Sequence, residues 1–352
     1  MRYKGAMGRR GWKHSLFVLA MVSSACTEKT DADYRDDVDV AVHASIGDSI
    51  AQLVQATRDL QAASPARAWR PGTTDAAAIT AMRDAWKRTR FAYEQIEGAI
   101  KAVFPALDAT IDSRYEESLA ALGGSVDRNP FDGRGVTGMH AIERILFAPE
   151  TRREVIAYEC SLPGYTPAAY PATDDEAIAF KTGLVQRLID DGDSLGKQWR
   201  KAEIDLNAAY RGQVGMMIDQ QDKVNLAVTG EEESRYANIT LADLRNNFDG
   251  TQNIYGLFRD WIHSKAAGGP SDLKIQAGFG ELATIYVMAG DALPEVPAEW
   301  DADDPTPENL ATPFGMMWRT IHESVDPSNE SSVVFELNQI ASLLGLPGPS
   351  QP

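Results

Sequence analysis

Helical spacing of apolar residues along most of the chain is the feature that most constrains its fold. Between residues 77 and 104, Met82, Trp86, Thr89 and Tyr93 recur every three or four positions, so they lie on one stripe of a helix. The same spacing recurs in four further segments: residues 38–62, 174–210, 241–262 and 273–293. No segment has the convincing alternation of a strand. The sequence therefore predicts an all-α fold.

The chain has 352 residues, 43% of them hydrophobic, and is long enough to bury two cores. We therefore predict two helical domains resembling four-helix bundles, with the boundary in a less regular region near residues 205–235. The predicted organisation is a signal peptide at 1–25, an acidic linker at 26–36, an N-terminal bundle at 37–205, a C-terminal bundle at 206–347 and a tail at 348–352.

The first 25 residues have the composition of an export signal. Five basic residues are interspersed before the apolar run SLFVLAMVSSA, which is too short to cross a bilayer but suits a signal-peptide core. The sequence therefore predicts an exported protein. The alternative is an interfacial helix that stays attached to the membrane.

Cys26 directly follows the small residues VSSA and precedes an acidic spacer, an arrangement that resembles a bacterial lipobox. In that motif the cysteine is lipidated and becomes the new N-terminus. Ser23 departs from the motif, which usually has an aliphatic residue there, so plain cleavage after Ala25 remains the alternative. If Cys26 is acylated, Cys160 is the only other cysteine; otherwise a disulfide between them is conceivable.

The charge of the chain is strongly negative. The formal net charge is −17, and without residues 1–25 the chain carries 29 basic and 51 acidic residues, or −22. Nucleic-acid binding is disfavoured, because phosphate contacts require an excess of lysine and arginine. A large negative field would gather cations, although solubility alone also accounts for it.

The stretch GMHAIERILF contains the most informative polar pair. His140 and Glu143 are three residues apart in a run with helical periodicity, so both side chains can point at one place. Imidazole and carboxylate ligands suit Fe, Zn, Mn or Cu. A pair needs a third ligand, and our first candidate is Glu97, which helical spacing places on one face with Arg90 and Tyr93. The alternative is a solvated polar face without a metal.

Other catalytic motifs are incomplete. The segment HESVD begins like a zinc-protease helix at His322, but Asp326 replaces the second histidine and Pro327 follows. Arg144 stands where the inverted zinc motif needs a histidine. We expect Arg144 to point away from Glu143, since adjacent helical residues are about 100° apart.

Three separate stretches together resemble the imelysin family of exported bacterial proteins. The matching residues are Trp86, Arg90, Tyr93 and Glu97 in the first stretch, Gly138, His140 and Glu143 of a Gly-x-His-x-x-Glu signature in the second, and Gly250, Asn253 and Tyr255 in the third. The resemblance implies two helical bundles with a pocket between them, into which the signature helix points. Family members are often lipid-anchored or periplasmic and are associated with iron acquisition, and some are described as metallopeptidases.

We therefore favour a protein that binds iron or an iron-containing ligand, with a divalent or ferric ion held by Glu97, His140 and Glu143. Arg90, Tyr93 or Asn253 would orient these ligands or contact the bound molecule. The protein would be anchored in the outer membrane through Cys26, facing the periplasm or the surface, or else be periplasmic, with an envelope permease or receptor as partner. The alternatives are a metallopeptidase that uses the same residues and a non-catalytic envelope scaffold in which His140 only packs between bundles.

Overall fold

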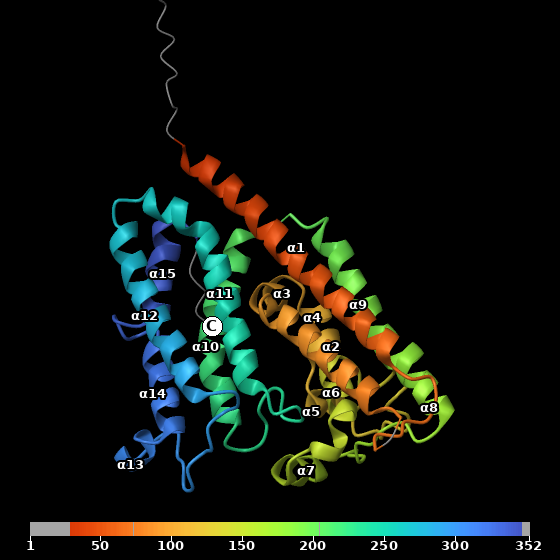
Figure 1. Cartoon of the computed structure of the whole chain (residues 1–352). Helices are drawn as coiled ribbons and strands as arrows, with labels where there is room; N and C mark the ends of the chain where they lie inside the picture. Colours follow the sequence, from red (N-terminus) through yellow and green to blue (C-terminus); the bar gives the residue numbers. More distant parts are fainter. Residues whose placement is uncertain (1–28, 73, 204, 347–352) are drawn as a thin grey trace, which may run out of the picture.

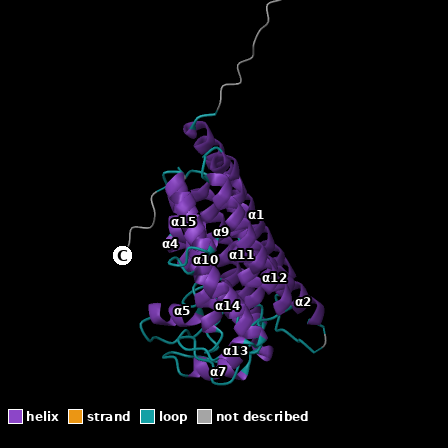
Figure 2. Cartoon of the chain, turned by 90° about the vertical axis from the view of Figure 1, so that its left-hand side faces the viewer, coloured by secondary structure: helices purple, strands orange, loops and turns teal. Residues whose placement is uncertain are grey.

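The computed structural model describes residues 29–72, 74–203 and 205–346, and every regular element within these ranges is a helix (Figure 2). The all-α prediction is confirmed. Cys26 and the predicted signal peptide and tail lie outside the described residues. Among the helices described, none is both long and apolar enough to cross a membrane.

The N-terminal part is built on a long helix, α1 (Asp31–Ala63), against which α2 (Ala76–Glu94) and α9 (Val185–Trp199) pack (Figure 1). Apolar side chains at helical spacing, such as Ile46 and Leu53, are fully buried at these contacts. The shorter elements between α2 and α9 are α3 (Glu97–Val103), α4 (Pro105–Asp112), α5 (Tyr115–Ala121), α6 (Met139–Leu146), η1 (Ala148–Glu150), α7 (Arg153–Cys160), α8 (Asp174–Ala179) and the π-helical turn η2 (Phe180–Leu184).

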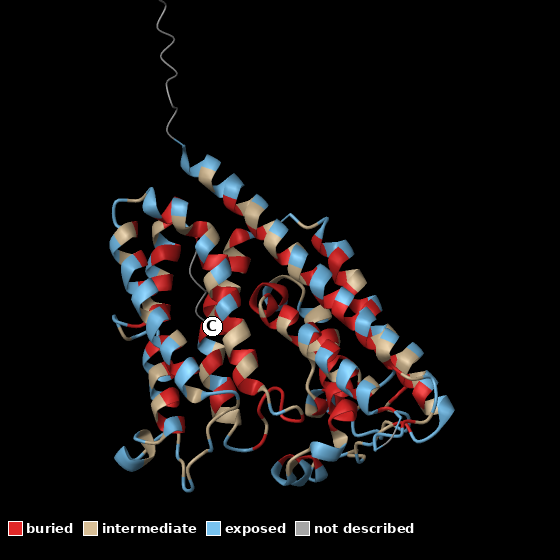
Figure 3. Cartoon of the chain, in the orientation of Figure 1, coloured by how far each residue is buried: buried red, intermediate tan, exposed pale blue. Residues whose placement is uncertain are grey.

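The C-terminal part, coloured green to blue in Figure 1, is a second group of helices packed side by side. Its core includes aromatic rings in edge contact, among them Phe248 and Phe279 with centroids 5.5 Å apart. Buried residues in both parts face the neighbouring helices, and exposed residues face outward (Figure 3). The elements are α10 (Leu206–Leu226), α11 (Thr240–His263), α12 (Gly268–Ala289), α13 (Pro307–Leu310), α14 (Pro313–Val325) and α15 (Val333–Leu343).

The two parts contact each other closely through glycines. Helix α3 packs against α10 where Gly98 meets Gly212, and a side chain at either position would collide with the backbone of the other helix. Gly250 on α11 likewise lies against the backbone of Gln95. Because no Cβ intervenes, the helices that carry polar groups from both parts can approach within contact distance.

Two helix boundaries differ from the sequence predictions. Helix α1 begins at Asp31, inside the segment predicted as the linker 26–36, because Thr30 caps it and forms a reciprocal capping box with Asp33. The helix predicted to run from 77 to 104 is interrupted between Glu94 and Glu97. Glu97 is therefore the first residue of α3 and does not share a continuous helix with Arg90 and Tyr93.

Candidate metal site

The signature helix α6 is placed by the glycine that precedes it. Gly138 has a φ of 88°, in the region that favours glycine, and a Cβ there would lie 2.7 Å from the carbonyl oxygen of Ile111. The start of α6 therefore packs directly on the end of α4. This contact brings His140, the second residue of α6, next to Asp112, the last residue of α4.

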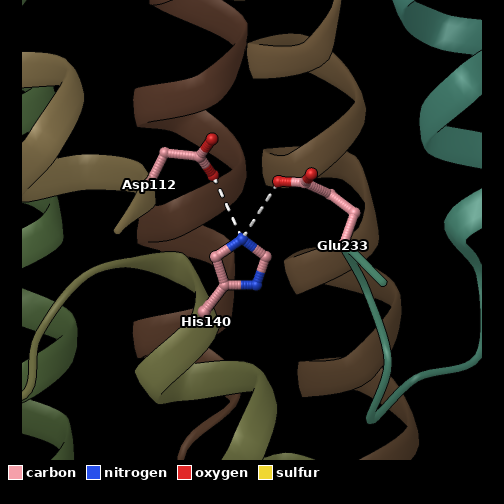
Figure 4. A group of neighbouring side chains, drawn as sticks. All are labelled: Asp112, His140 and Glu233. Carbon is pink, nitrogen blue, oxygen red and sulfur yellow. Dashed lines mark ion pairs between the residues drawn. The ribbon is translucent and has the colours of Figure 1, made fainter. Parts of the chain in front are cut away.

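His140 is 1% exposed, and its Nε2 atom points at two carboxylates (Figure 4). Nε2 lies 3.4 Å from Asp112 Oδ1 and 3.5 Å from Glu233 Oε1, and it makes no well-directed hydrogen bond. The three residues come from α6, from α4 and from the loop between α10 and α11. Their ligand atoms all lie within 4.8 Å of one another, so they form a group that could hold a metal ion.

Glu143 fixes the orientation of the imidazole from the opposite side. Its Oε2 lies 2.9 Å from His140 Nδ1, and its Oε1 accepts hydrogen bonds from the backbone N–H groups of Tyr236 at 3.1 Å and Ala237 at 2.9 Å. An acceptor beside Nδ1 keeps a proton on that atom, so Nε2, which faces Asp112 and Glu233, is the nitrogen whose proton a metal ion would displace.

The loop that supplies Glu233 is buried and anchored to the N-terminal part. Residues 232–236 are all buried, which is unusual for a polar connecting segment. Arg235 in this loop donates a hydrogen bond from Nη1 to Glu116 Oε1 at 3.3 Å and lies over the ring of Tyr158. The anchoring places Glu233 opposite His140 even though 93 positions separate the two residues in the sequence.

Arg90 holds the acidic groups together from beneath the site. Its side chain is fully buried and donates a hydrogen bond to Glu233 at 2.8 Å, and it also contacts Glu94 and Asp112. Asp243 lies 3.5 Å from Arg90 Nε. A guanidinium is suited to this position because its five donors can serve several carboxylates at once.

Glu97 belongs to a neighbouring group. It accepts hydrogen bonds from Lys223 Nζ at 3.0 Å and from Asn247 Nδ2 at 3.2 Å. Its ligand atom lies within 4.8 Å of those of Glu94 and Asp112. Asp112 is therefore common to this group and to the group around His140.

Burial and charge together set the ionisation of the site. Burial lowers the pKa of His140, but Asp112, Glu143 and Glu233 outweigh it, so that pKa lies well above its usual value. Burial would raise the pKa of Glu233, but Lys223 and Arg90 hold it well below its usual range. Glu233 is thus a charged carboxylate at neutral pH.

Several carboxyl groups beside the site have raised pKa values, and burial is the largest cause for Glu94, Asp243 and Asp108. Burial raises the pKa of Asp243 to about 7, against the opposing charge of Arg90. Burial also raises the pKa of Asp108 to about 6, although Tyr93 donates a hydrogen bond to it. The site contains more carboxyl groups than basic side chains to pair with them, which favours an added cation.

A cavity of about 450 Å³ adjoins the site at Asp112 and Glu233. Acidic side chains predominate in its wall, which creates a negative potential leading toward Asp112 and Glu233. The charged lining residues are Glu97, Asp108, Asp112, Glu117, Asp219, Asp222 and Glu233, together with Lys101, Arg114 and Lys223.

The structure brings together some of the residues singled out in the sequence. His140 and Glu143 are hydrogen-bonded, and Arg90 contacts Asp112 and Glu233 beside them. Tyr93 donates its hydroxyl proton to Asp108, and Asn253 is exposed on α11. Arg144 points away from Glu143, as expected, and pairs with Glu159 at 2.9 Å.

Two residues of the site, Asp112 and Glu233, were missed by the sequence analysis. Asp112 ends a short helix, and Glu233 lies in an acidic run, EEES, in a region without clear periodicity. The acidic run was the only signal for Glu233, and it does not distinguish a ligand from a solvated surface.

Two comparisons with known proteins agree on a relationship. The model of the imelysin family matches residues 42–281, more than half of the chain. Iron-regulated protein A of Synechococcus elongatus is 27% identical over 341 residues, which cover 84% of this chain and 84% of that protein.

Proposed function

The chain belongs to the imelysin family, and from this premise we propose that it is an exported, lipid-anchored protein of iron acquisition that binds iron or a small iron-containing ligand. One observation carries the metal-binding part. A buried imidazole nitrogen without a directed hydrogen bond faces two carboxylate oxygens beside an acidic cavity. One nitrogen and two oxygens are a suitable start for the coordination of iron.

Iron is the ion that we favour, because the relative reported above is named an iron-regulated protein. His140, Asp112 and Glu233 would bind the ion, and Glu143 would orient His140 rather than bind it. The acidic cavity would then concentrate cations at its entrance. An envelope permease or receptor would receive the cargo.

The same geometry favours binding over peptide hydrolysis. A metallopeptidase needs a general base beside the metal-bound water, and Glu143 is the carboxylate nearest to His140 along the chain. Both oxygens of Glu143 are engaged, one by two backbone N–H groups and the other by His140. Glu143 is therefore not directed at the place where a metal ion held by His140 Nε2 would carry a water molecule.

Calorimetric titration of the purified protein with Fe²⁺ under anaerobic conditions, and with Mn²⁺ and Zn²⁺, tests the proposal. We expect His140→Ala to weaken binding at least about tenfold, because it removes the only nitrogen ligand. His322→Ala is the matched control, because His322 is exposed and stacks on Trp318 away from the site.

The proposal fails if none of these ions binds, or if His140→Ala binds them as the native protein does. Chelator-sensitive cleavage of a peptide library would instead support the metallopeptidase. Absence of both activities would support the scaffold.

A further inference from the structure

Lys223, on α10, is a buried ammonium group in the middle of the acidic cluster. The residue is 6% exposed. Its Nζ lies 2.9 Å from Asn247 Oδ1, 3.0 Å from Glu97 Oε2 and 3.3 Å from Glu94 Oε2, and the hydrogen bonds to these oxygens use all three of its protons. A fourth oxygen, Glu233 Oε2, is 3.6 Å away.

The carboxylate oxygens near Lys223 Nζ belong to a group of side chains that could hold a cation. Glu94, Glu97 and Asp112 offer ligand atoms within 4.8 Å of one another, as a metal-binding group does. Glu94 is 1% exposed, and its Oε1 receives no well-directed hydrogen bond although it lies against Arg90. Its other oxygen, Oε2, is the one that Lys223 contacts, so an ion that replaced the ammonium group would find this oxygen in place.

This position is connected to the site around His140 by two shared carboxylates. Asp112 belongs to both groups of ligand atoms. Glu233 directs Oε1 at His140 Nε2 and Oε2 at Lys223 Nζ. Carboxylates that serve two neighbouring cation positions are the usual construction of a two-metal site.

We propose that Lys223 fills the second of two adjacent cation positions with its own ammonium group, so that the protein binds one metal ion where its carboxylates could hold a pair. The inference rests on the proposed function at His140. A metal ion in the second position would have to break three charge-assisted hydrogen bonds and leave the ammonium group buried without a partner. Removal of the ammonium group makes this position available to a second divalent cation.

Metal stoichiometry in a variant that lacks the charge tests the proposal. Lys223→Met keeps an unbranched side chain of similar length and removes the ammonium group. With Mn²⁺ as the probe, we expect one ion per native chain and two per Lys223→Met chain, by calorimetry and by metal analysis after gel filtration. Electron paramagnetic resonance of the variant should show the spin coupling of a manganese pair.

Lys101→Met is the matched control. Lys101 lines the same cavity and loses the same charge, but its ion pair is with Asp219 at 3.4 Å, outside the cluster. We expect this variant to bind one ion. The double variant Lys223→Met/Glu97→Gln removes one ligand of the second position and should also return to one ion.

The outcomes separate the inference from the proposed function. One ion in both the native protein and Lys223→Met overturns the inference and leaves the site at His140 intact, and two ions in the native protein also overturn it. No ion in the native protein overturns the proposed function. If Lys223→Met folds only in the presence of Mn²⁺, the inference is supported. If the variant folds neither with nor without Mn²⁺, the position does not accept a metal ion and the inference fails.

Discussion

At the scale of the residue, the hydrogen bond between Glu143 and His140 decides which imidazole nitrogen can bind a metal. The carboxylate accepts from Nδ1–H, so Nε2 is the nitrogen that can give up its proton to a metal ion. In Glu143→Gln the amide oxygen would still accept from the backbone of Tyr236 and Ala237, which turns the amide N–H₂ toward Nδ1. Nδ1 then accepts a hydrogen bond from the amide, so the ring keeps its proton on Nε2. That nitrogen then has no lone pair with which to bind a metal ion.

We expect Glu143→Gln to weaken Mn²⁺ binding about 10–100-fold, as measured by calorimetry. Nitrogen-15 spectra of the histidine ring should show the exchange of tautomers. Glu117→Gln removes a negative charge from the wall of the same cavity without touching His140 and serves as the control. Equal losses in both variants would mean that charge, not the tautomer, controls binding.

At this scale the sequence predicted the site residues that are close together along the chain. The spacing of His140 and Glu143 predicted that both could point at one place, and they are hydrogen-bonded. Asp112 and Glu233 could not be found in this way, because their approach to His140 depends on a helix end and on a buried loop. Glu97 was placed on the face of Arg90 by assuming one continuous helix, and the helix is interrupted between Glu94 and Glu97.

At the scale of the element, the contact between the end of α4 and the start of α6 determines the distance between two proposed ligands. Gly138 has φ 88° and ψ −171°, a conformation that is essentially restricted to glycine. In Gly138→Ala the backbone strain of about 1–3 kcal/mol adds to a collision with the carbonyl oxygen of Ile111. We expect a loss of stability of at least this size and weaker Mn²⁺ binding, because α6 must move away from Asp112.

Gly280→Ala is the matched control for this prediction. Gly280 is exposed within α12, and a Cβ there would meet open space. Alanine is the better helix former, so this variant should gain about 0.5–1 kcal/mol in urea unfolding. If Gly138→Ala unfolds at the same urea concentration as the native protein, the junction between α4 and α6 does not need the glycine.

The helices themselves could be predicted from periodicity, but their interruptions could not. The break between α2 and α3 is at Gln95, whose backbone lies against Gly250 of α11. Such a contact depends on a partner that is distant in the sequence, and it leaves the apolar spacing on either side unchanged. Periodicity therefore predicts where helices form and not where another backbone requires them to bend.

At the scale of the whole molecule, the negative net charge of the chain disfavours direct binding to a membrane. Attachment to the membrane therefore depends on the lipid proposed at Cys26. Without residues 1–25 the chain carries 29 basic and 51 acidic residues, so an anionic lipid surface repels it. Lipid chains on Cys26 would have to supply the whole attachment, and two chains suffice for stable anchoring. We therefore expect the full chain, expressed in a Gram-negative host, to incorporate labelled palmitate and to sediment with the membranes.

Cys26→Ala should abolish the label and move the protein from the membranes to the soluble periplasmic fraction. Cys160→Ala, at the other cysteine, which is exposed, should leave both label and fraction unchanged. If the Cys26→Ala protein remains with the membranes, the attachment does not need the lipid. That result would favour the alternative in which the apolar run SLFVLAMVSSA is retained as an interfacial helix.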